Sequence, residues 1–111
     1  MTETQLVKAV ILALGSRFDC RVWRQNTGAL RDATGRLIRF GIPGAADITG
    51  ILANGRRLEI EVKTDTGRLS KQQARYGQMI HRMGGLYFVV RSVEDAVDRV
   101  DAALLGEAGT R

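Results

Sequence analysis

The chain has 111 residues, of which 44% are hydrophobic and 26% charged, so it suits one small globular domain and excludes disorder, collagen and coiled coil. Seventeen basic and twelve acidic side chains leave a formal net charge of +5, which favours a polyanionic partner such as nucleic acid. The single cysteine and single histidine exclude an internal disulfide, a cysteine zinc cluster and any site that needs two histidines. We expect one domain over residues 1–105 and a frayed tail over residues 106–111.

The first half of the chain predicts a helix followed by strands. Thr2 and Gln5 have capping-box spacing, and apolar side chains at helical period follow them to Leu14, so this helix should stop at Gly15. The longest apolar run, residues 9–14, is too short to cross a membrane and lacks the charges and cleavage site of a signal peptide; we therefore expect a cytoplasmic protein. Segments of β-type composition follow, separated by turn residues. They cover residues 20–25, 37–40 and 47–52.

A hairpin and a second helix are predicted next. Asn54-Gly55 is a hairpin turn signal, and residues 57–63 alternate between apolar and charged side chains. Ser70 and Gln73 repeat the capping-box spacing, so the helix should start at Ser70 and run to about Met83.

The remaining segments complete an α/β pattern. The apolar run 86–90 is typical of a central strand buried on both faces, and Ser92 should open a last helix. The order is then helix, three or four strands, helix, strand, helix, which in its shorter form is α-β-β-β-α-β-α. We expect a small mixed β-sheet flanked by helices.

The charged end of the alternating strand carries the sharpest chemical signal. Alternation places Glu61 and Lys63 on one face, and Asp47 begins the preceding strand. Two carboxylates and a lysine are the smallest set that could hydrolyse a phosphodiester with a bound divalent cation. Carboxylate and backbone oxygens suit Mg²⁺ or Mn²⁺. The alternative is a solvated strand face with a surface ion pair, because Glu-x-Lys alone is a weak signal.

The length of the hairpin loop decides whether these groups meet. A two-residue Asn54-Gly55 turn would set Asp47 opposite Val62 and turn it away from Glu61. A three-residue loop, with Gly55 in the left-handed bulge position, would set Asp47 directly opposite Glu61 with Cβ atoms about 5 Å apart. We predict the three-residue loop, because only that register makes a single site.

Several motifs in fixed order add specificity to this weak pattern. They are Asn26-Thr27-Gly28, Gly44-Ala45-Ala46-Asp47, Glu61-Val62-Lys63, and Leu69-Ser70 followed by Gln73. Together they resemble the VRR-NUC family, in particular its stand-alone phage-type members, within the PD-(D/E)xK (restriction-endonuclease-like) nuclease superfamily. The resemblance covers about residues 3–97. It departs from the family at Ala46, where a proline usually precedes the aspartate.

The resemblance implies a restriction-endonuclease-like core and a Mg²⁺- or Mn²⁺-dependent DNA endonuclease. Such enzymes are often structure-selective, which points to junctions, flaps, forks or nicked duplexes in replication, repair or recombination. It also implies a homodimer related in fold to Holliday-junction resolvases, and no small-molecule cofactor. Lys63, Gln73 and Glu3 take catalytic or supporting roles by this resemblance. The metal ligands it implies are Asp47, Glu61 and the backbone carbonyl of Val62.

Two further functions stay open at this stage. A non-catalytic nucleic-acid-binding module fits the basic charge equally well, and so does an accessory subunit that is active only in a larger assembly. Five closely spaced arginines are candidate phosphate contacts, or else a solvated sheet edge, and residues 26–40 are a candidate dimer surface. The arginines are Arg21, Arg24, Arg31, Arg36 and Arg39.

Other conspicuous side chains are expected to be structural. Glu59 shares the face of Glu61 but lies nearer the hairpin tip, where we expect it to be solvated. His81 should lie on the surface of the second helix, and Cys20 should be a small core residue. Trp23 could stack on a base, but a place in the core is favoured for it, as for Tyr76.

Overall fold

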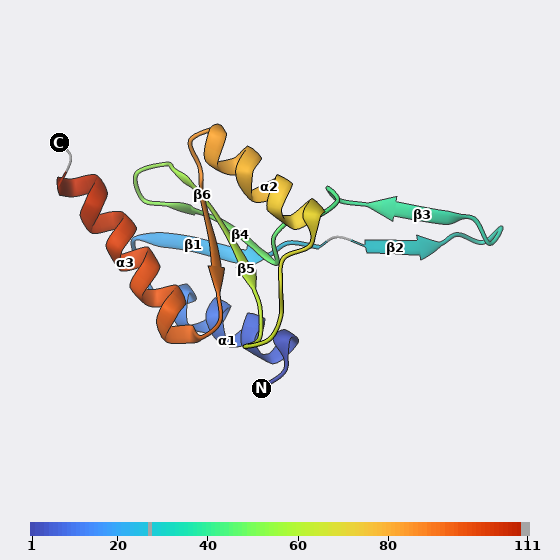
Figure 1. Cartoon of the computed structure of the whole chain (residues 1–111), viewed down its shortest axis with the longest axis horizontal. Helices are drawn as coiled ribbons and strands as arrows, with labels where there is room; N and C mark the ends of the chain where they lie inside the picture. Colours follow the sequence, from blue (N-terminus) through green and yellow to red (C-terminus); the bar gives the residue numbers. More distant parts are fainter. Residues whose placement is uncertain (27, 110–111) are drawn as a thin grey trace.

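A computed structural model describes residues 1–26 and 28–109, and in this part of the chain three helices surround a four-stranded sheet from which a two-stranded hairpin projects (Figure 1). The side chains of residues 107–109 are not described, and Thr27 of the predicted Asn26-Thr27-Gly28 break lies outside the described residues. In chain order the elements are α1 (Glu3–Gly15), β1 (Cys20–Arg24), β2 (Gly28–Arg31), β3 (Leu37–Phe40), β4 (Ile48–Leu52), β5 (Arg57–Val62), α2 (Lys71–Arg82), β6 (Leu86–Val90) and α3 (Val93–Gly109).

The main sheet is mixed, as predicted, with strand order β1-β4-β5-β6. The first three strands pair antiparallel, whereas β6 runs parallel to β5. A parallel neighbour needs a long crossover, and α2 supplies it. Helices α1 and α3 cover one face of the sheet and α2 lies against the other (Figure 1). Within the described residues five strands precede α2, where three or four were expected; the main sheet alone, without β2 and β3, gives the order helix, three strands, helix, strand, helix.

Strand β5 is buried on both of its faces. Leu58, Ile60 and Val62 are fully buried in the cluster with α1 and α3, as the alternating pattern predicts. The opposite face of β5 is buried as well, because α2 packs over it, and there Glu59 and Glu61 are only 0% and 1% exposed. The two glutamates of this strand therefore do not form a solvated face.

Both predicted capping boxes form. The side chains of Thr2 and Gln5 close one at the start of α1, and those of Ser70 and Gln73 close the other at the start of α2. Gly15 ends α1, as expected. The last helix begins after Ser92, whose hydroxyl accepts from the Asp95 N–H, and it continues through the predicted tail as far as Gly109.

The predicted register is confirmed. The β4–β5 pairs Ile48↔Ile60 and Thr49↔Glu59 extend to place Asp47 opposite Glu61. The loop has three residues, since the Leu52 N–H donates to the Arg56 carbonyl and Gly55 has φ +88°. Residues with a side chain rarely adopt this backbone conformation, so the glycine at this position favours the bulged loop.

Two strands differ from expectation. Strand β6 is at the edge of the sheet rather than its centre; its residues are apolar because helices cover both of its faces, and a parallel partner is found on one side only. Strand β2 was not predicted, and it pairs with β3 in a separate hairpin. All eight residues of these two strands are exposed, so no burial pattern marks β2 in the sequence. No helix in the described ranges is long and apolar enough to cross a membrane.

Candidate metal centre

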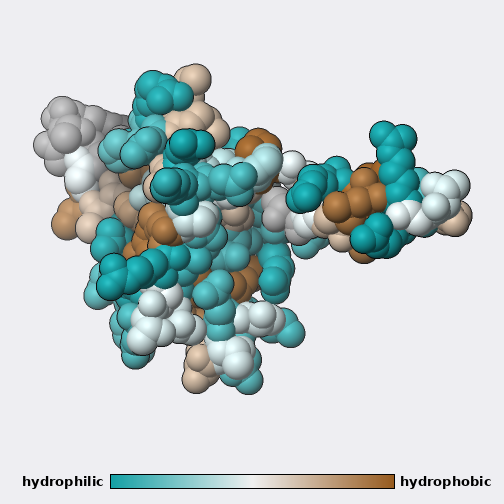
Figure 2. All heavy atoms as spheres, turned by 45° about the vertical axis from the view of Figure 1, so that its right-hand side comes forward, coloured by the Kyte–Doolittle hydropathy of each residue, from teal (hydrophilic) through white to brown (hydrophobic). Residues whose placement is uncertain are grey.

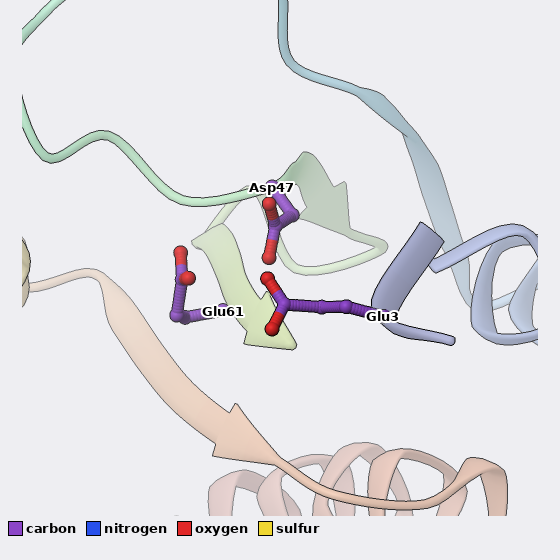
Figure 3. Close-up of side chains that lie close together, drawn as sticks. All are labelled: Glu3, Asp47 and Glu61. Carbon is purple, nitrogen blue, oxygen red and sulfur yellow. The ribbon is translucent and has the colours of Figure 1, made fainter. Parts of the chain in front are cut away.

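Three carboxylates from three different elements converge at one end of the main sheet (Figure 3). Glu3 comes from the first turn of α1, Asp47 from the residue before β4, and Glu61 from β5. One oxygen of each lies within 4.8 Å of the others. These are the three acidic residues that the sequence and its family resemblance singled out, and the fold brings all of them together.

Asp47 is fixed by backbone contacts on both sides. Its Oδ2 accepts from the Val62 N–H at 2.8 Å, and its carbonyl accepts from the Gln25 N–H at 2.8 Å. The carboxylate is thereby held against the end of β5, opposite Glu61. The role of the Val62 carbonyl as a metal ligand stays a prediction.

Lys63 and Gln73 meet at one oxygen of Glu61. Lys63 Nζ lies 3.5 Å from Glu61 Oε2, and Gln73 Nε2 donates to the same oxygen at 3.0 Å. The Gln73 Oε1 also accepts from the Ser70 N–H at 2.9 Å. Gln73 was expected both in a capping box and in the site, and this one side chain makes both contacts.

The loop before Asp47 packs closely on the start of α2. Gly44 has φ +78°, and a Cβ there would lie 2.4 Å from the Gln72 carbonyl carbon. Only glycine permits that approach. Ala46, which departs from the motif that the sequence resembles, is 1% exposed and packs against Tyr76 and Ile80. The alanine thus occupies a small core that anchors Asp47.

The electrostatics of the cluster favour a bound cation. Burial and the nearby Asp47 carboxylate raise the pKa of Glu61 from 4.5 to about 7, while Lys63 acts in the opposite direction. Glu61 Oε1 is buried and has no hydrogen-bond partner among the described residues. A group of crowded carboxylate oxygens, one with free lone pairs, is a donor set that fits a hard divalent cation. Glu3, Asp47 and Glu61 could therefore hold a metal ion.

A second buried carboxylate lies behind this cluster and corrects the prediction for Glu59. This residue is not solvated, because the hydroxyls of Tyr76 and Thr49 both donate to its carboxylate. Arg57 Nε donates to it at 3.1 Å and Gln25 Nε2 at 3.3 Å. Four donors on a fully buried carboxylate make it a structural hub rather than a metal ligand.

This hub supports the metal centre through Gln25. Besides its bond to Glu59, Gln25 Nε2 donates to the Ala46 carbonyl at 2.9 Å, so it ties the loop that precedes Asp47. One signal could have revealed the hub. Glu59 is two residues before Glu61 on a strand, and Tyr76 is three residues after Gln73 on the facing helix, so the two carboxylates face two helix side chains with similar spacing.

The five candidate arginines are all exposed, but they do not form one surface. Arg21 and Arg24 lie on β1 of the main sheet. The other three lie on or beside the projecting hairpin, where Arg31 donates to the Gly35 carbonyl at 2.9 Å. Their contact with phosphates stays a prediction.

The remaining expectations divide between confirmed and wrong. Cys20 and Tyr76 are buried and His81 is exposed, as expected. Gln72, one residue from Gln73, is exposed. Trp23 is 51% exposed and does not belong to the core, because β1 is an edge strand whose outer face α2 does not cover.

Comparison with known proteins supports the fold. No protein-family model matches the chain, and no curated protein matches it. Among solved structures it is similar to a VRR_NUC domain protein, with a TM-score of 0.64 over 91% of this chain and 86% of that one. The sequence identity is 16%, so the likeness shows a shared fold.

Proposed function

We propose that this protein is a metal-dependent DNA endonuclease of the PD-(D/E)xK type. One observation carries the proposal: Glu3, Asp47 and Glu61 converge within 4.8 Å beside Lys63, at the end of a buried strand. A module that only binds nucleic acid gains nothing from burying acidic groups next to a polyanion, since like charges repel. The similarity of the fold to a VRR_NUC domain protein supports the same conclusion.

The side chains have distinct parts in this proposal. Asp47 and Glu61, with Glu3 and the Val62 carbonyl, would hold Mg²⁺ or Mn²⁺. When bound, such an ion polarises a phosphoryl oxygen and lowers the pKa of a coordinated water. Lys63, whose side chain is only 11% exposed, orients the attacking water or stabilises the negative charge that develops on the phosphate.

Gln73 has a positioning part beside these groups. It fixes Glu61 Oε2, while Oε1 of the same carboxylate has no hydrogen-bond partner among the described residues. The orientation of Glu61 is therefore set before a substrate arrives.

Branched or nicked DNA is the proposed substrate class, and a homodimer the proposed assembly. The hairpin β2–β3 has one apolar face, and brown hydrophobic atoms gather on this projecting arm in Figure 2. Leu30, Ile38 and Phe40 share that face by the register of the hairpin and are 67%, 43% and 42% exposed. A two-stranded ribbon is marginal in water by itself, and a second copy would bring the same apolar face to cover it. Two copies also provide two sites for two strands.

A cleavage assay tests the nuclease. Labelled single strands, duplexes, flaps and four-way junctions are incubated with Mg²⁺ or Mn²⁺, and with EDTA as the metal-free arm. We expect cleavage that EDTA abolishes and that Lys63→Ala lowers by about a thousandfold, the scale of losing one preorganised charge-stabilising group. Lys8→Ala is the matched control, because Lys8 is an exposed lysine of α1. Cleavage that survives EDTA, or equal activity of the two lysine variants, contradicts the proposal.

A further inference from the structure

Helix α2 leaves part of its sheet face open. It packs against β6 and bonds to Glu59 and Glu61 of β5, but Trp23 on β1 and Ile51 on β4 remain 51% and 44% exposed. Both side chains point to the α2 side, because their strand neighbours Val22 and Leu52 are buried in the core on the other side. We call Arg21, Trp23, Ile51 and Arg57 the open sheet face.

Basic and apolar side chains are interleaved on the open sheet face. Across the strands Arg21 pairs with Ile51, and Ile51 pairs with Arg57, so an arginine stands on each side of the apolar centre. Trp23 occupies the next position along β1 on the same face. A hollow of about 430 Å³ adjoins the tryptophan and is lined also by Thr49, Gly50, Ile51, Gly55 and Arg57. Arg57 is the one charged group among these described lining residues.

The open sheet face is continuous with the metal centre. Trp23 pairs with Thr49, and Thr49 is two residues along β4 from Asp47 on the same face. At about 3.3 Å per strand residue, the two rows of side chains are roughly 7 Å apart. That span equals about two nucleotides at the ~3.4 Å axial rise of a duplex strand.

We propose that Trp23 stacks on an unpaired nucleobase next to the cleaved phosphodiester, with Arg21 and Arg57 holding the neighbouring phosphates. The inference rests on the proposed nuclease function and narrows its substrate to DNA with an unpaired nucleotide beside the cut. An exposed indole offers a flat π-face that accepts any base, and guanidinium groups bind phosphate in a bidentate manner.

Charge selects this occupant over a second copy. A second copy would bring Arg21 and Arg57 against basic groups of the same kind, whereas a nucleic-acid strand brings phosphates at nucleotide spacing. Arg57 is already paired with Glu59 through Nε, yet its side chain is 55% exposed. The other N–H groups of a guanidinium remain available for a second anion.

The single tryptophan of the chain makes a direct test possible, because Trp23 alone accounts for indole emission. A short oligothymidine and a blunt duplex are titrated into the full chain in EDTA, so that nothing is cut. We expect the oligothymidine to quench Trp23 emission and the duplex to bind with little quenching. In titrations followed by the fluorescence anisotropy of a dye-labelled oligothymidine, Trp23→Ala should weaken binding about 5- to 150-fold, and Trp23→Phe should restore most of that loss.

Phe18→Ala is the matched control, because Phe18 is 99% exposed in the loop before β1 and lies outside the open sheet face. We expect this variant to bind the oligothymidine like the wild type. Equal binding by Trp23→Ala and wild type would overturn the inference. A change of Trp23 emission with protein concentration in the absence of DNA would also overturn it, because it would show that another copy of the chain covers this face. If Trp23→Ala does not fold, the wild-type titration and Trp23→Phe decide.

The stacking site and the nuclease activity can be rejected independently of each other. Quenching by oligothymidine without any Mg²⁺-dependent cleavage would reject the nuclease and keep the stacking site. Cleavage of flaps with the same rate in Trp23→Ala, and no quenching, would reject the stacking site and keep the nuclease.

Discussion

The metal centre and the β2–β3 hairpin are built in opposite ways. In the metal centre Glu61 and Lys63 are buried, and Glu61 contacts both Lys63 and Gln73. In the hairpin every strand residue is exposed on both faces, and the two strands hold one another through four residue pairs. The body of the molecule fixes its own site, whereas the apolar side chains of the arm stay exposed.

This difference separates the residues that stabilise the fold from those that the proposed dimer would use. A buried side chain contributes to stability through the area it removes from water and the cavity its loss would leave. An exposed apolar side chain contributes little until a partner covers it. Substitutions in the two regions should therefore affect different measurements.

A pair of leucines gives the largest expected contrast. Leu58 on β5 is 0% exposed and Leu30 on β2 is 67% exposed. Leu58→Ala should lower the free energy of unfolding by about 2–5 kcal/mol. Leu30→Ala should change it by no more than about 0.5 kcal/mol in dilute protein, as measured by urea denaturation.

The same two variants test the proposed dimer. In sedimentation equilibrium, Leu30→Ala should shift the population toward monomer, because it removes apolar area from the arm, while the folded fraction of Leu58→Ala should associate like the wild type. A monomeric wild type, or association unaffected by Leu30→Ala, would contradict the proposed dimer through the arm.

The raised pKa of Glu61 predicts a pH dependence that is confined to the metal centre. The folded carboxyl keeps its proton up to about pH 7, whereas the unfolded one loses it near 4.5. Stability is therefore greatest below pH 4.5 for this group and falls as pH rises toward 7. At 1.36 kcal/mol per pKa unit the loss is at most about 3 kcal/mol in metal-free buffer.

Thermal unfolding across pH 4.5 to 8 checks this expectation. Glu61→Gln should flatten the dependence of the unfolding temperature on pH, and Mg²⁺ should stabilise the wild type at pH 8 more than the variant. Asp19 and Asp32 have a lowered pKa, so their contributions change below this window. A wild-type curve as flat as that of Glu61→Gln would contradict the electrostatic description of the site.

The smallest effect should come from two adjacent glutamines. Gln73 bonds to Glu61 and closes the capping box, whereas Gln72 is exposed. Gln73→Ala should lower kcat/KM about tenfold, the scale of one hydrogen bond to a charged group, and Gln72→Ala should leave it unchanged. Steady-state cleavage kinetics measure both, and an equal loss in the two variants would remove Gln73 from the site.

Local signals in the sequence determined much of this protein. The capping boxes fixed the starts of α1 and α2, because they satisfy backbone N–H groups through residues three apart. Asn54-Gly55 and the need to unite Asp47 with Glu61 indicated the bulged loop and hence the register of β4 and β5. The family resemblance added Glu3 and Gln73, which come from elements distant in sequence.

Tertiary structure alone decided which faces are covered. Helix α2 buries Glu59 and leaves Trp23 exposed, although composition favours a solvated glutamate and a buried tryptophan. The tertiary structure also places the apolar strand β6 at an edge of the sheet. Strand β2 has no alternation of buried and exposed residues by which the sequence could have predicted it. Burial depends on which elements pack across a face of the sheet, and those elements come from segments far apart along the chain. The periodicity within one segment therefore does not predict it.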